Sequence, residues 1–392
     1  MANVNTMNFV QLSTVMNDLY QQATGQKAIA IVDESTFVSV AQKTLQVGYD
    51  PVIGALSQVL SKTIFSVRPY SAKFKGLEVD NQKYGSITRK VTAIDKPFED
   101  DDRLPLTDGT SVDDQKINKP EVVQLNYYGA DMYQKRITYF KDQLDSAMES
   151  SAQFGDFISM VVSNIMDMIE QAKEVTSRAT INNFIAGVIA GGTADQKVHL
   201  LTEFNNATGA NYTKQDVLAP ANIEAFSKWA YAFISKKVDM LSERTSMFHT
   251  NLTGKTIMRH TPKQDLKTYF LSDFLHMFSA EVLADTYNDS FLSVSDVESV
   301  NYWQSAKTPD TIKIKPTYLS ADGTLTTPSA AVEQSNIVGI LFDREAMGIT
   351  TCSQWTASAP FNARGGYTNQ FWHFTEKYWN DFTENAIVIT LD

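Results

Sequence analysis

The sequence predicts an α+β fold, and three patterns point to that class. Segments between Thr63 and Phe140 have the apolar–polar alternation of extended strands. An apolar repeat at helical spacing then runs from Ser151 to Ala190. From Gly191 onward, short strands and helices alternate up to a final apolar strand. The expected protein therefore combines sheets with one very long helix.

The composition indicates a folded, acidic protein. The chain has 392 residues, of which 43% are hydrophobic, and a formal net charge of −11. This length suggests roughly two or three domains. The acidity argues against a protein that wraps nucleic acid, because phosphate binding needs Lys and Arg. Cys352 is the single cysteine, which excludes an intrachain disulfide and a cysteine-rich zinc site and favours a reducing compartment.

No membrane partner is expected. The first 22 residues lack a basic region followed by an apolar core, so they do not resemble a secretion signal. No stretch approaches the ~20 apolar residues of a membrane span.

The first fifty residues predict two short amphipathic helices that need a surface to lie on. The second helix is expected to end at Gly48 and Pro51. The apolar stripes that predict them are Leu12, Val15, Met16 and Leu19, then Phe37, Val40, Ala41 and Leu45.

A projecting hairpin is expected next. Ile87–Ile94 and Glu121–Tyr128 are strand-like, as is Ile64–Val67 before them. The loop Asp95–Pro120 between the two later strands is long and polar, and such loops are usually functional or mobile. Strands of about ten residues would carry its tip roughly 30 Å from the body.

The long helical segment begins after the Ser150 cap and ends at Gly191 and Gly192. At 1.5 Å per residue it would span roughly 60 Å, the length of a strut across an elongated molecule. Residues Gly191–Ala219 have the composition of a linker, and Pro220 opens another helix.

Short elements are predicted in the remainder of the chain. Ala321–Gly323 marks the turn of a hairpin, and an aromatic-rich segment precedes the final strand. The expected elements are strands at Met247–Thr250, Phe291–Val294, Ile337–Phe342 and Ala386–Leu391, and a helix at Pro262–Phe278.

The residues predict no catalytic, cofactor-binding or metal site. Leu252–Thr256 ends like a phosphate-binding loop, but His249 stands where that loop needs glycine, so a simple turn is expected. The five histidines lack metal-ligand spacing, and Cys352 lacks the sequence context of a nucleophile. The acidic run Glu99–Asp102 lacks the spacing of a calcium loop. The chain instead carries elements for contact with neighbours.

The order of these elements resembles the major capsid proteins of tailed bacteriophages, with the HK-ninety-seven fold. The sharpest local likeness is Ile340–Gly348, a strand followed by an Asp-led turn. Arg364–Tyr367 and Asn385–Ile389 are similar to the closing strands of phi-twenty-nine-type small podovirus capsid proteins.

The resemblance implies a division of the chain into five parts. These are an N-arm (1–60), an extended E-loop hairpin with the start of the peripheral domain (61–140), the peripheral domain with its spine helix (141–211), an axial domain (212–350) and a C-terminal return to the peripheral domain (351–392).

The resemblance also implies a non-enzymatic protein that self-assembles. Hexamers and pentamers of one chain would form an icosahedral head around double-stranded DNA, which they would enclose without sequence-specific binding. A separate scaffolding protein and a portal protein are the implied partners. Assembly is expected in the host cytoplasm, and the product is the virion capsid.

Two alternatives stay open at this level. An encapsulin-type cage shares the fold but encloses enzymes. A carbohydrate-active enzyme with an unrecognised carboxylate pair belongs to a different class, and Trp303, Trp355 or Trp372 would stack on its sugars.

Overall fold

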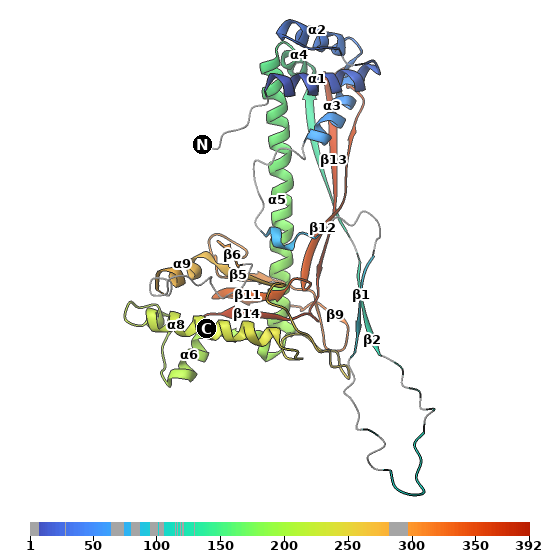
Figure 1. Ribbon diagram of the computed structural model, residues 1–392. Coiled ribbons are helices and arrows are strands. Elements are labelled where there is room, and N and C mark those ends of the chain that lie inside the picture. Colours follow the sequence, from blue (N-terminus) through green and yellow to red (C-terminus); the bar gives the residue numbers. More distant parts are fainter. Residues whose placement is uncertain are drawn as a thin grey trace.

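In a computed structural model, the protein is elongated along one helix (Figure 1). The structure describes residues 8–27, 29–63, 74–79, 87–94, 101, 106–113, 115, 117, 119, 121–128, 130–281 and 297–392. The predicted strands Ile64–Val67 and Phe291–Val294 and most of the acidic run Glu99–Asp102 lie outside the described residues.

Helix α5 (Ser151–Gly191) is the longest element and confirms the predicted strut. It has 41 residues and begins at Ser150, whose side chain accepts a hydrogen bond from the Gln153 amide. Two separate hydrophobic cores pack against its two halves. The helix therefore joins two bodies that do not share a core (Figure 1).

The first core surrounds the N-terminal half of α5. It is formed with α1 (Phe9–Thr24), α2 (Glu34–Leu45), α3 (Tyr49–Thr63) and α4 (Lys141–Ala147). The first two helices were predicted, whereas α3 was not. Pro51 does not end α2 but lies in the first turn of α3, where its missing N–H needs no partner. The N-terminal helices thus lie on their own chain.

A three-stranded antiparallel sheet extends this core along α5. Its order is β12 (Met347–Ser358), β13 (Tyr367–Asn380) and β3 (Asp131–Phe140). Alternate residues of β13, such as Thr368, Gln370 and Trp372, are buried, while their neighbours face outward. The aromatic-rich segment that precedes the final strand is therefore the central strand of this sheet.

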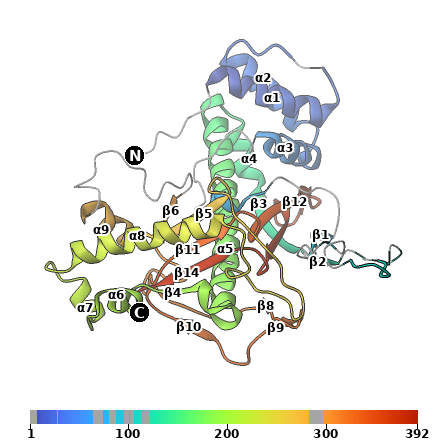
Figure 2. The same ribbon diagram turned by 60° about the horizontal axis from the view of Figure 1, so that its bottom comes forward.

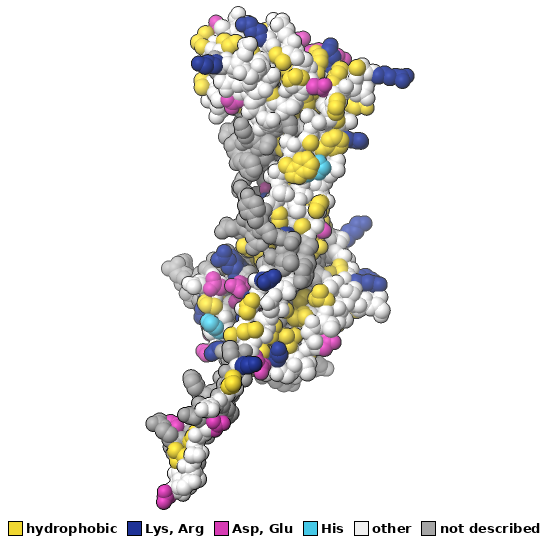
Figure 3. Space-filling view, turned by 90° about the vertical axis from the view of Figure 1, so that its right-hand side faces the viewer, with side chains coloured by type: hydrophobic (Ala, Val, Ile, Leu, Met, Phe, Trp, Pro, Cys, Tyr) yellow, Lys and Arg dark blue, Asp and Glu magenta, His cyan; other side chains and the backbone are white. Residues whose placement is uncertain are grey.

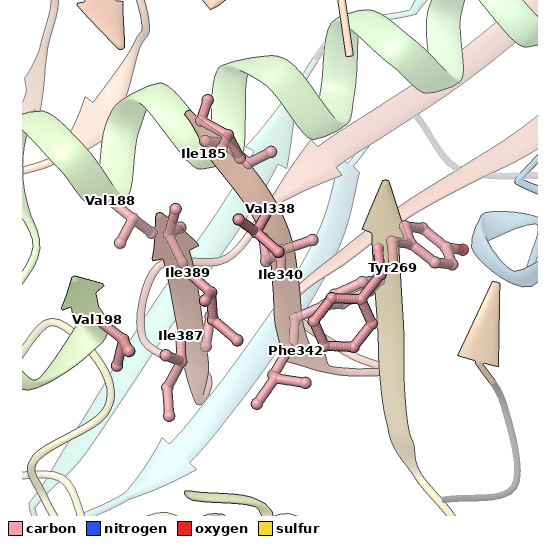
Figure 4. Packing of buried hydrophobic residues seen from close by; sticks show 14 of the residues in the cluster. Ile185, Val188, Val198, Tyr269, Val338, Ile340, Phe342, Ile387 and Ile389 are labelled. Carbon is pink, nitrogen blue, oxygen red and sulfur yellow. The ribbon is translucent and has the colours of Figure 1, made fainter. Parts of the chain in front are cut away.

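The second core is a five-stranded mixed sheet covered by helices (Figure 4). Ile185 and Val188 of α5 lie over one part of it, and α8 (Ile223–Ser242) runs along it (Figure 2). The strand order is β4 (Lys197–His199), β14 (Ala386–Thr390), β11 (Ile337–Asp343), β5 (Leu266–Leu271) and β6 (Val297–Val300). The predicted strands at 337–342 and 386–391 are thus confirmed as its centre.

Short elements complete this body. The predicted hairpin around Gly323 is confirmed as β8 (Tyr318–Leu319) paired with β9 (Leu325–Thr326), and Gly323 has a φ of +84° at the turn. The remaining elements are η2 (Lys75–Leu77), η3 (Ala194–Gln196), α6 (Leu200–Thr208), α7 (Lys214–Val217), α9 (Ser272–Glu281), β7 (Ile312–Ile314) and β10 (Val332–Gln334).

The predicted strands of the projecting hairpin also form. β1 (Ile87–Ala93) and β2 (Val122–Tyr128) pair antiparallel as a separate two-stranded sheet beside the body. The described residues 106–113, which follow β1 in the chain, lie away from the body (Figure 1).

The prediction of a helix at Pro262–Phe278 is wrong in its first half. Leu266–Leu271 is strand β5, and only Ser272–Glu281 is helical. Leu266 and Phe270 have helical spacing, but five of the six β5 residues are buried, since β5 lies between β11 and β6. A strand buried on both faces loses the alternation by which strands are recognised.

Two further predictions are corrected. Met247–Thr250 is not a strand, because Phe248 and His249 are both fully buried in a bent segment. Gly191–Ala219 is not a linker, because it contains β4, which pairs parallel with β14, and α6. Val198 and Phe204 in this segment are buried in the second core.

Substitution of two helical glycines tests the packing on α5. A Cβ at Gly187 would lie 2.5 Å from the Phe382 ring, which stacks on Phe184 at 4.9 Å. We expect Gly187→Ala to destabilise the protein by about 1–3 kcal/mol through overpacking. Gly54 in α3 has no atom near its Cβ position, so Gly54→Ala should stabilise by about 0.5–1 kcal/mol. Urea unfolding measures both, and equal effects would contradict this packing.

Candidate functional site

The motif at Leu252–Thr256 is a turn, as expected. Gly254 has a φ of +75°, and the Lys255 amide donates to the Leu252 carbonyl at 2.8 Å. The next regular element is strand β5, whereas a phosphate-binding loop opens a helix.

His249 and Cys352 have surroundings that fit a role in the fold. His249 is fully buried, with Nδ1 3.0 Å from Asn385 Oδ1 and Nε2 2.8 Å from the Ile257 carbonyl. Burial lowers the pKa of His249, so the ring is neutral at pH 7. Cys352 is partly exposed at a register shift between β12 and β13. Across the described ranges, no cluster of His, Cys, Asp or Glu could hold a metal ion.

The three tryptophans of the enzyme hypothesis do not form a sugar-binding surface. Trp303 and Trp372 are each only 1% exposed, so neither can stack on a ligand. A cleft of about 1170 Å³ borders α5, and Arg178 lines it. That guanidinium is 2.8 Å from Glu174 and 3.8 Å from the Tyr302 ring, so its contacts support the fold. No helix in the described part of the chain could span a bilayer.

The hairpin β1–β2 has one face on the body and one face in solvent. Val123 is buried and Leu125 packs against the second core, while Lys90 lies opposite Leu125 on the same face. On the other face Val91 is 61% exposed, and Val122 near the end of β2 is 54% exposed. The hairpin thus presents apolar side chains that its own chain does not cover.

A cluster of charged side chains attaches the hairpin to the body. We call it the Lys90 cluster: Lys90, Arg259, Glu345, Asp381 and Glu384. Lys90 Nζ lies 2.9 Å from Glu345 and 3.0 Å from Asp381, and it also contacts Glu384. Arg259 contacts Glu384 at 3.0 Å and donates to Thr92 of β1 at 3.0 Å. Both cations therefore link the body to β1.

Burial and excess negative charge control titration in this cluster. Burial opposes the charge of Lys90, but Asp381, Glu384 and Glu345 outweigh it and raise the pKa of Lys90. Burial raises the pKa of Glu384 to about 6 against the opposite effect of Lys90 and Arg259. Burial, and then the charge of Asp381, raise the pKa of Tyr127 in β2. Removal of one partner from such a buried group costs about 3–5 kcal/mol.

A second contact surface is the outward face of the β12–β13–β3 sheet. Met132 is 81% exposed and Trp355 is 53% exposed, and Trp355 stacks on His373 with ring centroids 3.9 Å apart. Figure 3 shows hydrophobic side chains gathered beside a histidine on this narrow part of the molecule. Exposed apolar groups of this kind mark sites of protein contact.

The sequence predicted the hairpin but missed the cluster that attaches it. Glu345 lies in the Asp-led turn of the 340–348 segment, where the Glu345 amide donates to Asp343 at 2.8 Å. That turn is confirmed, but no spacing in the sequence links it to Lys90 or Arg259.

Comparison with solved structures defines the class of protein. A capsid structure of Staphylococcus phage Andhra is similar, with a TM-score of 0.53 and 9% sequence identity, covering 84% of this chain and 86% of that one. A structure of head fiber and inner core protein gp22 of native bacteriophage P68 has a TM-score of 0.54 and 10% identity, with coverage of 83% and 86%. The chain has the HK-ninety-seven fold of phage capsid proteins.

The family follows from the sequence match. Residues 12–390 match the Phi29-like phage major capsid protein family, and the chain belongs to that family. No curated protein matches the chain. The protein is therefore a structural subunit of a phage capsid shell and a component of the virion. The encapsulin and carbohydrate-active alternatives have no support.

The pKa of Glu384 predicts a pH-dependent contribution to stability. A carboxyl group whose pKa is raised in the fold disfavours folding once it ionises. The stability of the wild type relative to Glu384→Gln should thus be highest below pH 4.5. It should fall by about 2 kcal/mol as the pH rises through 6, which is the shift from 4.5 to about 6 expressed as free energy. Urea unfolding of both proteins at pH 4.5 and 7.5 measures it. A pH-independent difference would contradict the assignment.

Proposed function

We propose that this capsid protein self-assembles into an icosahedral, podovirus-type head around double-stranded DNA, with hexamers and pentamers of one chain as its units. The single observation that carries this proposal is the hairpin. It leaves the body as a separate two-stranded sheet, and Val91 and Val122 on it are exposed. In a closed shell such apolar side chains are covered by the next subunit.

We assign the parts of the chain to roles in that shell. The hairpin within residues 61–140 reaches over an adjacent subunit. The N-arm, residues 1–60, packs beneath another subunit with the surface that the first core of its own chain leaves exposed. Residues 141–211 and 351–392 form the peripheral domain, and residues 212–350 form the axial domain. The two cores along α5 support a division into two bodies, but they do not coincide with these limits. The second core combines α8, β5 and β11 with Val198 and Phe204 of residues 141–211 and with β14 of residues 351–392.

The proposed partners are a separate scaffolding protein, a portal protein and packaged DNA. The net charge of −11 supports enclosure without tight binding, because like charges repel. Assembly takes place in the host cytoplasm in this proposal. The contribution of the chain is mechanical and not enzymatic. Each contact can be weak, because many of them close the shell together.

Deletion of the hairpin tip tests the proposal. Replacement of residues 95–120 by a short turn should leave the circular dichroism spectrum and the unfolding midpoint unchanged, because none of the described residues in this range belongs to either core. Closed shells should be lost when the variant is expressed with the neighbouring gene products. Sedimentation and negative-stain microscopy measure the particles. Shells of normal size and yield from this deletion would refute the role of the hairpin.

A further inference from the structure

The Lys90 cluster lies where three parts of the molecule meet. Glu345 is in the turn that leads from β11 to β12, so it joins the five-stranded sheet to the three-stranded sheet. Asp381 and Glu384 are in the connection from β13 to β14, which leads back again. Lys90 is the central residue of β1. The Lys90 ammonium group, which belongs to the hairpin, therefore contacts both of the connections that join the two sheets.

The other contacts of the hairpin constrain its orientation less. Within the described residues, β1 and β2 pair only with each other, so no ladder of backbone hydrogen bonds extends from the hairpin into either sheet. Val123 and Leu125 bury apolar surface against the body, and apolar burial has no directional preference. A hydrogen bond between charged groups, in contrast, is strong only at short distance and in good geometry.

Burial of these side chains makes separation of the charges costly in free energy. The side chains of Asp381 and Glu384 are 1% and 6% exposed, and that of Lys90 is 19% exposed. If the hairpin swung away, two buried carboxylates would lose their ammonium partner, and Arg259 would lose its bond to Thr92. Glu384 would keep Arg259 at 3.0 Å, but buried Asp381 would be left without the cation that pairs with it.

We propose that the Lys90 cluster sets the direction in which the hairpin leaves the subunit, and couples that direction to the relative setting of the two sheets. Lys90, Asp381 and Glu384 are positioning residues for assembly. This inference rests on the proposed function of the hairpin as an intersubunit contact. A subunit without the cluster keeps its two cores but directs its hairpin over a broad range of angles.

The direction of the hairpin can be measured in the unassembled full chain. Spin labels at Gln124→Cys on the exposed face of β2 and Ala225→Cys on α8, in a Cys352→Ser background, report one distance by pulsed electron resonance. We expect one narrow distance distribution in the parent protein. Lys90→Met should broaden it, while circular dichroism stays unchanged. A distribution as narrow as that of the parent would overturn the proposal, whatever the variant does in assembly.

The matched control is another lysine in an ion pair. Lys263 lies 2.6 Å from Asp239, but these two side chains are 48% and 64% exposed. Lys263→Met removes the same charge and should leave the distance distribution and the shell yield unchanged. Equal broadening in this control would show that loss of charge acts nonspecifically, and would overturn the proposal.

A milder variant keeps the proposal testable if Lys90→Met fails to fold. Glu345 contacts Lys90, but its side chain is 70% exposed, so Glu345→Gln should fold normally. We expect it to broaden the distribution less than Lys90→Met does. If Lys90→Met does not fold, a Glu345→Gln distribution identical to the parent would itself contradict the proposal.

Shell yield, measured on the same variants without labels, separates this inference from the proposed function. Lys90→Met should lower the yield of closed shells by at least about tenfold, because a small loss at each contact is multiplied over the shell. Normal shells despite a broadened distribution would show that direction does not matter for assembly, and would overturn the inference. Normal shells from the 95–120 deletion as well would refute the role of the hairpin in assembly.

Discussion

The burial of α5 by two independent hydrophobic cores is the constraint on which the architecture depends. A helix of 41 residues cannot be covered by one compact core, because a single domain is about as wide as half of that helix is long. Phe154 and Ile158 serve the first core, and Phe184 and Ile185 serve the second. The protein is therefore elongated because the two halves of its longest helix are buried in two separate cores.

This division also explains the path of the C-terminal strands. β11 and β14 belong to the second core, but the chain between them leaves as β12 and returns as β13 along α5. The two sheets are thus joined by two short connections at one place. Charged residues of those connections, together with Lys90 of β1 and Arg259, form the Lys90 cluster. Mechanical coupling between the bodies passes through α5 and through this junction.

Local patterns predicted much of the fold. The apolar period after Ser150 predicted α5 almost to the residue. Alternation predicted β1 and β2, and continuous apolar runs predicted the buried strands β11 and β14. The errors occur where tertiary burial outweighs local signals. β5 resembles a helix because it is buried on both faces, and α3 was missed because Gly48 and Pro51 were interpreted as an end. The Lys90 cluster was beyond prediction, since its members come from positions 90 to 384 with no shared spacing.

The outward face of the β12–β13–β3 sheet has a consequence for the free subunit. Met132 and the Trp355–His373 stack lie in water until another surface covers them. Apolar surface of this kind attracts any partner, including misfolded chains and the wrong edge of a sister molecule. The lifetime of the unincorporated polypeptide is therefore a hazard to the cell that makes it. We therefore expect precipitation when synthesis outpaces incorporation.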